Sequence, residues 1–142
     1  HADLQTDFKD VLIGFKFFEK ERNIFVKGKR INRPLKDNIF TIGMSIFETI
    51  LFRKIFWDIN AQPNIFDRSF YKKWKNPPLD FSLDLYVYYL AVKSNLKIKR
   101  FNVFFINRLH GHSKWNINWS SKIRFIIRTL RFSVNLVRGN SK

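Results

Sequence analysis

The sequence lacks the features of several protein classes. Cysteine is absent from its 142 residues, which excludes disulfide bonds and thiolate metal sites. No apolar run reaches the roughly 18 residues needed to span a bilayer. The most apolar region, residues 39–57, is interrupted by Glu48, Arg53 and Lys54. Internal repeats and low-complexity tracts are absent as well, so neither a solenoid nor a membrane-spanning protein is expected.

Acidic residues are missing from the second part of the chain. Asp84 is the last of the 11 Asp and Glu residues, and the formal net charge is +16. Residues 1–84 carry 15 Lys and Arg beside all 11 acids, whereas residues 85–142 carry 12 Lys and Arg and no acid. This asymmetry indicates an anionic partner, which is a nucleic acid, an anionic lipid or a ligand that bears phosphate.

Hydrophobic residues make up 45% of the chain and aromatic residues 18%, a composition typical of a folded domain. Apolar residues at helical spacing predict helices, as in the face formed by Val11, Leu12 and Phe15, and alternation near residue 100 predicts a strand. The class predicted is α/β. The expected helices cover residues 8–22, 37–56, 82–94 and 119–138, the expected strands residues 23–26 and 97–105, and the expected loops residues 27–30 and 58–66.

Two groups of acidic residues are candidates for chemistry. Asp3, Gln5 and Asp7 alternate, so at the end of a strand their oxygens can converge on a hard divalent cation; the simpler interpretation is a solvated strand end followed by a helix cap. Asp80 and Asp84 lie four residues apart at the start of a predicted helix, whose N-terminus should lower a carboxylate pKa. One of this pair serves as a cap in the simpler interpretation, and the other is then left for function.

Basic and aromatic residues fill the last third of the chain. Arg108-Leu-His-Gly-His-Ser-Lys114-Trp combines two cations with a glycine, a pattern that suits phosphate, and its histidines are more simply surface groups than metal ligands. Residues 119–138 combine an apolar stripe with Arg and Lys at its edges, which predicts a helix on a membrane surface. Nucleic-acid binding or plain core packing explains the same stripe.

Four segments follow one another in the chain: His-Ala-Asp-Leu-Gln-Thr-Asp (1–7), Asp-Ile-Asn-Ala-Gln-Pro-Asn-Ile-Phe (58–66), Asp-Phe-Ser-Leu-Asp-Leu-Tyr (80–86) and Arg-Leu-His-Gly-His-Ser-Lys-Trp (108–115). In this order they resemble family 2 glycosyltransferases, in particular polyprenyl-phosphate (dolichyl-phosphate) sugar synthases. The resemblance implies a GT-A fold, which is Rossmann-like, and an enzyme that uses a nucleotide-sugar donor, Mg²⁺ or Mn²⁺, and inversion at the sugar. It also implies a single partial domain over residues 1–142, because the family's first βαβ units would precede His1. A longer gene product is therefore expected, and residues 1–142 on their own are expected to be inactive.

The resemblance also implies roles for individual residues. Asp3 and Gln5 match the second aspartate and the glutamine of the family's metal motif, and His1 stands where the first aspartate is expected. Asp84 falls near the position of the general base. Lys29, Arg30, Arg108 and Lys114 resemble the groups that contact phosphate, and Gln62 and Arg68 resemble those that shape the sugar and acceptor pocket.

The predicted function is transfer of a sugar from a nucleotide sugar to a lipid phosphate or a glycan, as in cell-envelope glycan synthesis. Such an enzyme is expected in the cytoplasm, held peripherally on the anionic inner face of the membrane, with no nucleic-acid partner. The alternative is a non-catalytic basic module that binds nucleic acid or anionic membrane. The acidic motifs argue against the nucleic-acid alternative, because carboxylates repel phosphate unless they bind a metal ion. The acids concerned are Asp3, Asp7, Asp80 and Asp84.

Overall fold

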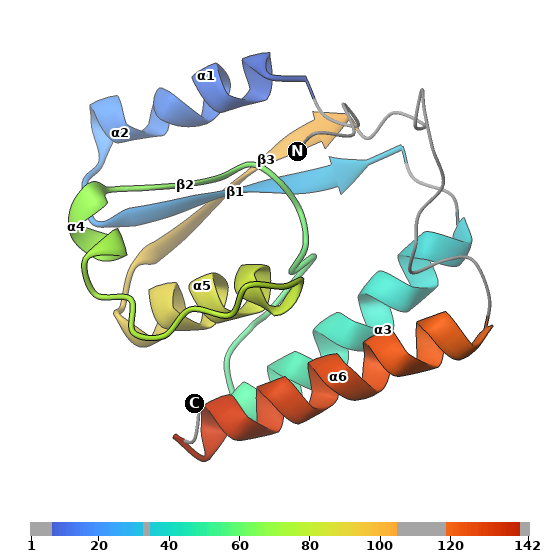
Figure 1. The fold of residues 1–142 in the computed structure, drawn as a ribbon. Helices are drawn as coiled ribbons and strands as arrows, with labels where there is room; N and C mark the ends of the chain where they lie inside the picture. Colours follow the sequence, from blue (N-terminus) through green and yellow to red (C-terminus); the bar gives the residue numbers. More distant parts are fainter. Residues whose placement is uncertain (1–6, 33–34, 105–118, 140–142) are drawn as a thin grey trace.

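The computed structural model describes residues 7–32, 35–104 and 119–139. The mixed α/β class predicted from the sequence is confirmed. Helices cover both faces of one small sheet, and two long helices lie side by side next to one of these layers (Figure 1).

The sheet has the strand order β2-β1-β3. The central strand β1 (Ile24–Ile31) runs parallel to β3 (Lys97–Phe104) and antiparallel to the short β2 (Asn64–Phe66). The basic loop predicted at residues 27–30 is wrong, because β1 continues through these residues. They pair with β3 along their whole length, and Lys27 also pairs with Asn64 of β2. Pairing with a parallel neighbour satisfies the backbone there, so the basic side chains do not end the strand.

Helices α1 (Lys9–Phe15) and α2 (Phe17–Lys20) lie over one face of the sheet, and α5 (Ser82–Lys93) lies over the other (Figure 1). The long helices α3 (Leu35–Phe52) and α6 (Trp119–Val137) pack beside α5. The helices predicted at 82–94 and 119–138 are confirmed to within a residue. The predicted loop at residues 58–66 contains β2, and the four-residue helix α4 (Arg68–Tyr71) follows that strand.

The helix expected at residues 8–22 is divided at Lys16, and its apolar stripe does not face the core. Val11, Leu12 and Phe15 are 42%, 60% and 60% exposed. The face that meets the sheet instead carries Gly14, where an added Cβ would lie only 2.4 Å from Ile65 Cδ1. Glycine lets the helix approach the sheet closely, and that contact decides which face is buried.

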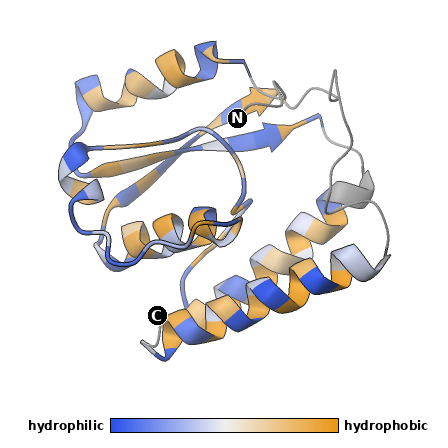
Figure 2. Cartoon of the chain, viewed as in Figure 1, coloured by the Kyte–Doolittle hydropathy of each residue, from blue (hydrophilic) through white to orange (hydrophobic). Residues whose placement is uncertain are grey.

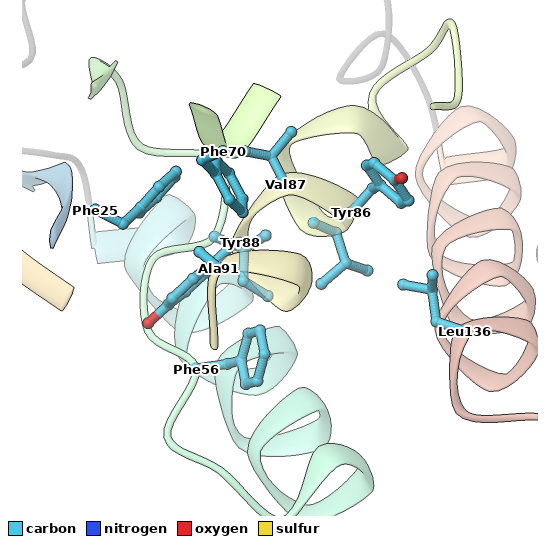
Figure 3. Close-up of a cluster of buried hydrophobic side chains, with 10 residues drawn as sticks. Phe25, Phe56, Phe70, Tyr86, Val87, Tyr88, Ala91 and Leu136 are labelled. Atoms are coloured by element: carbon cyan, nitrogen blue, oxygen red, sulfur yellow. The ribbon is translucent and has the colours of Figure 1, made fainter. Parts of the chain in front are cut away.

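The main apolar core lies between β1 and α5. The Phe25 and Tyr88 rings stack with centroids 6.3 Å apart, and Phe56 lies 4.6 Å from Tyr88 (Figure 3). Phe70 of α4 and Leu136 of α6 complete this cluster (Figure 3). Burial of one such side chain stabilises the fold by about 1.5–3 kcal/mol.

A second apolar cluster lies on the opposite face of β1. Ile24, Val26 and Ile65 are buried there, and Phe17, Phe18 and Phe101 pack against them. Because β1 is covered on both faces, its first three residues are all apolar and fully buried rather than alternating.

Helix α6 meets the rest of the molecule through only part of its surface. Ser133 and Leu136 are buried, whereas Ile123, Ile127 and Val137 are 51%, 42% and 49% exposed. Figure 2 shows apolar and polar residues side by side along the outside of α6 and its neighbour α3. Of the predicted stripe, Ile126, Leu130 and Val134 are partly buried, whereas the other three residues are exposed. Core packing therefore explains only part of the stripe.

Candidate functional site

Asp84 lies in the first turn of α5 and is held by two side-chain amides. Its Oδ1 accepts hydrogen bonds from Gln62 Nε2 (2.7 Å) and Asn64 Nδ2 (3.0 Å). Gln62 lies two residues before Asn64, so both amides come from the entrance to β2. Within the described part of the chain, Asp84 Oδ2 makes no hydrogen bond. One oxygen of the carboxylate is thus fixed, and the other can accept a proton.

Lys27 lies fully buried on the other side of Asn64. Its Nζ donates to Asn64 Oδ1 (2.8 Å) and to the backbone oxygen of Ala61 (2.9 Å), and it lies 5.5 Å from the centroid of the Tyr88 ring. Asn64 therefore connects the ammonium of Lys27 to the carboxylate of Asp84.

The pKa values in this cluster are dominated by burial. Burial raises the pKa of Asp84, and the charge of Lys27 and the hydrogen bond from Gln62 partly offset that rise. Burial lowers the pKa of Lys27 to about 7, although Asp84 favours its charged form. The expectation that the helix N-terminus lowers the Asp84 pKa is wrong, because loss of water outweighs the interactions that favour ionisation.

Arg30 and Asp58 form a second charged pair beside this cluster. Arg30 Nε donates to Asp58 Oδ1 (2.9 Å), and its backbone N–H donates to Oδ2 (3.0 Å). Burial opposes ionisation of Asp58, but the hydrogen bonds and charge of Arg30 prevail and lower the pKa of this carboxyl. The Asp58 backbone N–H in turn donates to Ser45 Oγ (3.1 Å), which ties the pair to α3.

Arg100 of β3 extends the cluster on the same side of the sheet. Its guanidinium donates to the Tyr88 hydroxyl (2.9 Å), to the Gly28 backbone oxygen (3.3 Å) and to the Trp57 backbone oxygen. Four charged side chains thus meet near the end of α5 that carries Asp84: Lys27, Arg30, Asp58 and Arg100.

Gly28 allows the segment before β2 to approach β1. A Cβ at Gly28 would lie 2.1 Å from the backbone oxygen of Gln62, and the Gly28 N–H donates to the Pro63 oxygen (3.0 Å). The Gln62–Pro63 peptide bond is cis. Only glycine fits this contact, so Gly28 helps to place Gln62 over the cluster.

Asp80 has a structural role. Its Oδ1 accepts a hydrogen bond from the Ser82 N–H (2.9 Å) at the start of α5, and its Oδ2 lies 3.4 Å from Arg128 Nε of α6. Asp80 thus satisfies one free N–H of the first turn, as a cap does, although the N-cap position itself is held by Phe81. The structure separates the pair, since Asp84 points to Gln62 and Asn64 instead.

The structure brings together some of the residues singled out from the sequence. Gln62 bonds directly to Asp84, and the charge of Arg30 offsets part of the rise in the Asp84 pKa that burial causes. Lys29 is exposed on β1, two residues after Lys27 and therefore on the same face of the strand. Arg68 begins α4, beyond the end of β2 that lies away from Gln62, and is not part of this cluster.

Asp3, Gln5, Arg108 and Lys114 lie outside the described residues. Among the residues that the structure does describe, no group of three or more His, Cys, Asp or Glu side chains could hold a metal ion. Within the same residues, no helix is both long and apolar enough to cross a membrane.

The sequence interpretation missed four members of the cluster. Asn64 could have been found, because it alternates with Gln62 and so shares its face of an extended segment. Lys27 gives a weaker signal as a lysine directly after the apolar run Ile24–Val26. Asp58 and Arg100 carry no local signal, since only the tertiary fold brings them to their partners.

The chain was compared with models of protein families, with curated proteins and with solved structures, and none of them matches.

Proposed function

We propose that this chain is the acceptor-side part of a family 2 glycosyltransferase with a GT-A fold. The observation that carries the proposal is the state of Asp84. Two amides hold one of its oxygens, burial raises its pKa, and its other oxygen is unbonded within the described residues. A carboxylate arranged in this way suits a general base, because a raised pKa makes it a better proton acceptor near neutral pH.

The position of Asp84 also supports this role. It lies in the first turn of α5, over the face of the parallel pair β1–β3 that carries Lys27 and Arg100. Polar groups that converge beside parallel strands are a common setting for ligand sites in α/β folds. Two of the four resembling segments, residues 58–66 and 80–86, contribute Gln62 and Asp84 to this one place.

In the proposed reaction, the hydroxyl oxygen of the acceptor attacks C1 of the sugar, and the nucleoside diphosphate departs. The proton of this hydroxyl passes to Asp84 Oδ2. General-base help of this kind contributes about 10²–10⁴-fold in rate. A lipid-phosphate acceptor is already ionised and needs no base. Stabilisation of the departing nucleoside diphosphate by cations is then the larger contribution.

Cations for the diphosphate come from the basic residues in this proposal. Lys29 is exposed on the same face of β1 as Lys27, so it can reach a bound anion, whereas Arg30 acts through its ion pair with Asp58. Arg108 and Lys114 complete the set by resemblance. Asp3 and Gln5 would hold Mg²⁺ or Mn²⁺, which neutralises charge on the diphosphate when bound.

We further propose that the outer surface of α3 and α6 rests on an anionic membrane. Four isoleucines of α3 are 40–72% exposed, and Ile123 and Ile127 of α6 add to them. The described part of α6 carries Arg124, Arg128 and Arg131 and no acid. An apolar face with cationic edges suits the boundary between lipid headgroups and acyl chains. The four residues of α3 are Ile39, Ile42, Ile46 and Ile50.

The test of the enzyme proposal uses the full-length gene product. Release of nucleoside diphosphate is measured with UDP-, GDP- and dTDP-sugars, Mg²⁺ or Mn²⁺, and either a hydroxyl or a polyprenyl-phosphate acceptor. Turnover that Asp3→Ala abolishes supports the proposal. Asp84→Asn should reduce turnover on a hydroxyl acceptor by about 10²-fold or more and spare a phosphate acceptor. Salt-sensitive binding of RNA or DNA without any turnover would overturn it.

The test of the membrane proposal is co-sedimentation with vesicles of neutral or partly anionic lipid. The double variant Ile123→Ser/Ile127→Ser should weaken binding to both, and Arg124→Gln/Arg131→Gln should weaken only the binding to anionic vesicles. Leu12→Ser is the control, because Leu12 is also exposed but lies on α1, away from α3 and α6 (Figure 1). Equal loss in the control variant would refute the assignment of this surface.

A further inference from the structure

Lys27 is the most unusual charged residue of the described chain. It lies in the central strand with none of its surface exposed. An ammonium loses several kcal/mol of hydration on burial, so a buried lysine persists only where hydrogen bonds and opposite charges replace water. Both are present here, since Nζ bonds to Asn64 Oδ1 and Ala61 O. Burial, Arg100 and Arg30 oppose the charged form of Lys27, whereas Asp84 and Asp58 favour it.

The bond from Lys27 decides how the amide of Asn64 is oriented. A lysine ammonium only donates hydrogen bonds, so Asn64 must turn its oxygen toward Lys27. The NH₂ group of Asn64 then points to Asp84, where Nδ2 lies 3.0 Å from Oδ1. The reversed amide would place two donors against each other at Lys27 and present its oxygen to the carboxylate.

The orientation of Asn64 fixes that of Asp84. With Asn64 Nδ2 and Gln62 Nε2 both donating to Oδ1, rotation of the carboxylate would break both bonds. Hydrogen bonds to a charged group are stronger than those between neutral groups, so this position of the carboxylate is preferred. Oδ2 is the oxygen left for the acceptor.

We propose that Lys27 is the positioning residue of Asp84, acting through the amide of Asn64 to keep Oδ2 turned to the acceptor and, by its charge, to keep the carboxylate ionised. Its catalytic consequence rests on the proposed function, whereas the linkage between the three side chains does not.

The first test follows Asp84 by NMR in the chain itself, with Lys27→Met as the variant because methionine has a similar length and no charge. The Asp84 carboxyl carbon is titrated in both proteins. Removal of the cation should raise the Asp84 pKa by about one unit or more. In Lys27→Met, the NMR signals of the Asn64 side-chain NH₂ group should lose the chemical-shift change that the Asp84 carboxylate causes. An unchanged Asp84 titration in a folded variant would overturn the proposal.

A double-mutant cycle separates positioning from a general effect of the substitution. Asn64→Leu removes the connecting amide. The rotation of the Asp84 side chain is measured from its coupling constants, and Lys27→Met should change it far less in the Asn64→Leu background than in the unmodified protein. Equal effects of Lys27→Met in both backgrounds would refute the linkage. If Lys27→Met does not fold, the unmodified protein decides. The Asn64 NH₂ signals must then shift with the same midpoint as the Lys27 side chain, and independent midpoints would overturn the proposal.

The catalytic arm uses the full-length protein and a hydroxyl acceptor. Lys27→Met should lower kcat, leave the KM for the nucleotide sugar within about twofold, and move the acidic limb of the pH–rate profile upward with the Asp84 pKa. If the unmodified protein shows no transferase activity, the proposed function is refuted, but the NMR result on the three side chains still holds. An unmoved acidic limb beside a raised Asp84 pKa would refute only the catalytic role of this linkage.

Discussion

Replacing Glu48 by glutamine should remove a large pH dependence of the folding stability. Glu48 of α3 is fully buried against α6. Its Oε1 lies 2.6 Å from Ser133 Oγ, and Oε2 has no hydrogen-bond partner among the residues that the structure describes. Burial raises its pKa to about 7, despite the hydrogen bond from Ser133. An ionised carboxylate here is therefore costly, and the protonated acid is favoured.

The hydroxyl of Ser133 explains why a proton on Glu48 fits. Ser133 Oγ is within reach of both Glu48 Oε1 and the Thr129 backbone oxygen (2.8 Å), yet it carries one proton. When Glu48 is protonated, it can donate to Ser133 while Ser133 donates to Thr129. Glutamine can do the same through its NH₂ group at every pH.

The magnitude follows from the difference between the two states. Between pH 4.5 and about 7 the folded chain keeps a proton on Glu48 that the unfolded chain releases, so stability falls as pH rises through this window and is level above it. At about 1.4 kcal/mol per pH unit, the difference from 4.5 to about 7 corresponds to about 3 kcal/mol. The Glu48→Gln variant should therefore gain up to about 3 kcal/mol relative to the unmodified chain between pH 4.5 and pH 8.

The assay is urea unfolding followed by circular dichroism at several pH values. The quantity compared is the difference in unfolding free energy between variant and unmodified chain, because other titrating groups cancel in it. Glu19→Gln, at an exposed position on α2, is the matched control and should leave the profile unchanged. A Glu48→Gln profile parallel to that of the unmodified protein would refute the burial argument.

Two further predictions concern the candidate site. Gly28→Ala should destabilise the fold by about 1–3 kcal/mol in urea unfolding, since its Cβ would lie 2.1 Å from the Gln62 backbone oxygen. Gly43→Ala is the control and should stabilise α3 by about 1 kcal/mol, because no atom lies within 4 Å of the added Cβ. Equal effects of the two substitutions would contradict the close approach at Gly28. Asp58→Asn should cost about 3–5 kcal/mol at pH 7, because it removes the negative charge from the buried ion pair with Arg30. Because the pKa of Asp58 is lowered in the folded state, this penalty should shrink as the pH falls below the ordinary aspartate value near 3.8, and a penalty independent of pH would contradict the ion pair.

Local patterns predicted the elements whose contacts agree with their own periodicity. The helix at Ser82–Lys93 and the strand at Lys97–Phe104 follow directly from spacing and from the turn between them. That turn is a Schellman motif: the Leu96 N–H donates to Ala91 O, and Asn95 has a positive φ of 55°. Asparagine tolerates this conformation, so the local sequence and the fold agree here.

Elements defined by long-range contacts were not predictable in the same way. Strand β2 is three residues long and exists because it pairs with β1, so no period-2 pattern can develop within it. The expectation that the apolar stripe of α1 faces the core is wrong for the same reason. Its longest apolar stripe is exposed, and the contact with Ile65 depends on the small size of Gly14.

The sequence by itself determined the α/β class, the positions of the long helices and the basic second part of the chain. These depend on residue types and on spacings within about twenty residues. Asp84 was a candidate from its spacing to Asp80 and from the family resemblance, and Gln62 from the resemblance alone. Only the tertiary structure decided that Lys27 is buried, that Asn64 connects it to Asp84, and that Asp84 has a raised rather than a lowered pKa. Loss of water and the approach of groups 20 to 60 residues apart set these properties, and neither is encoded in a local pattern.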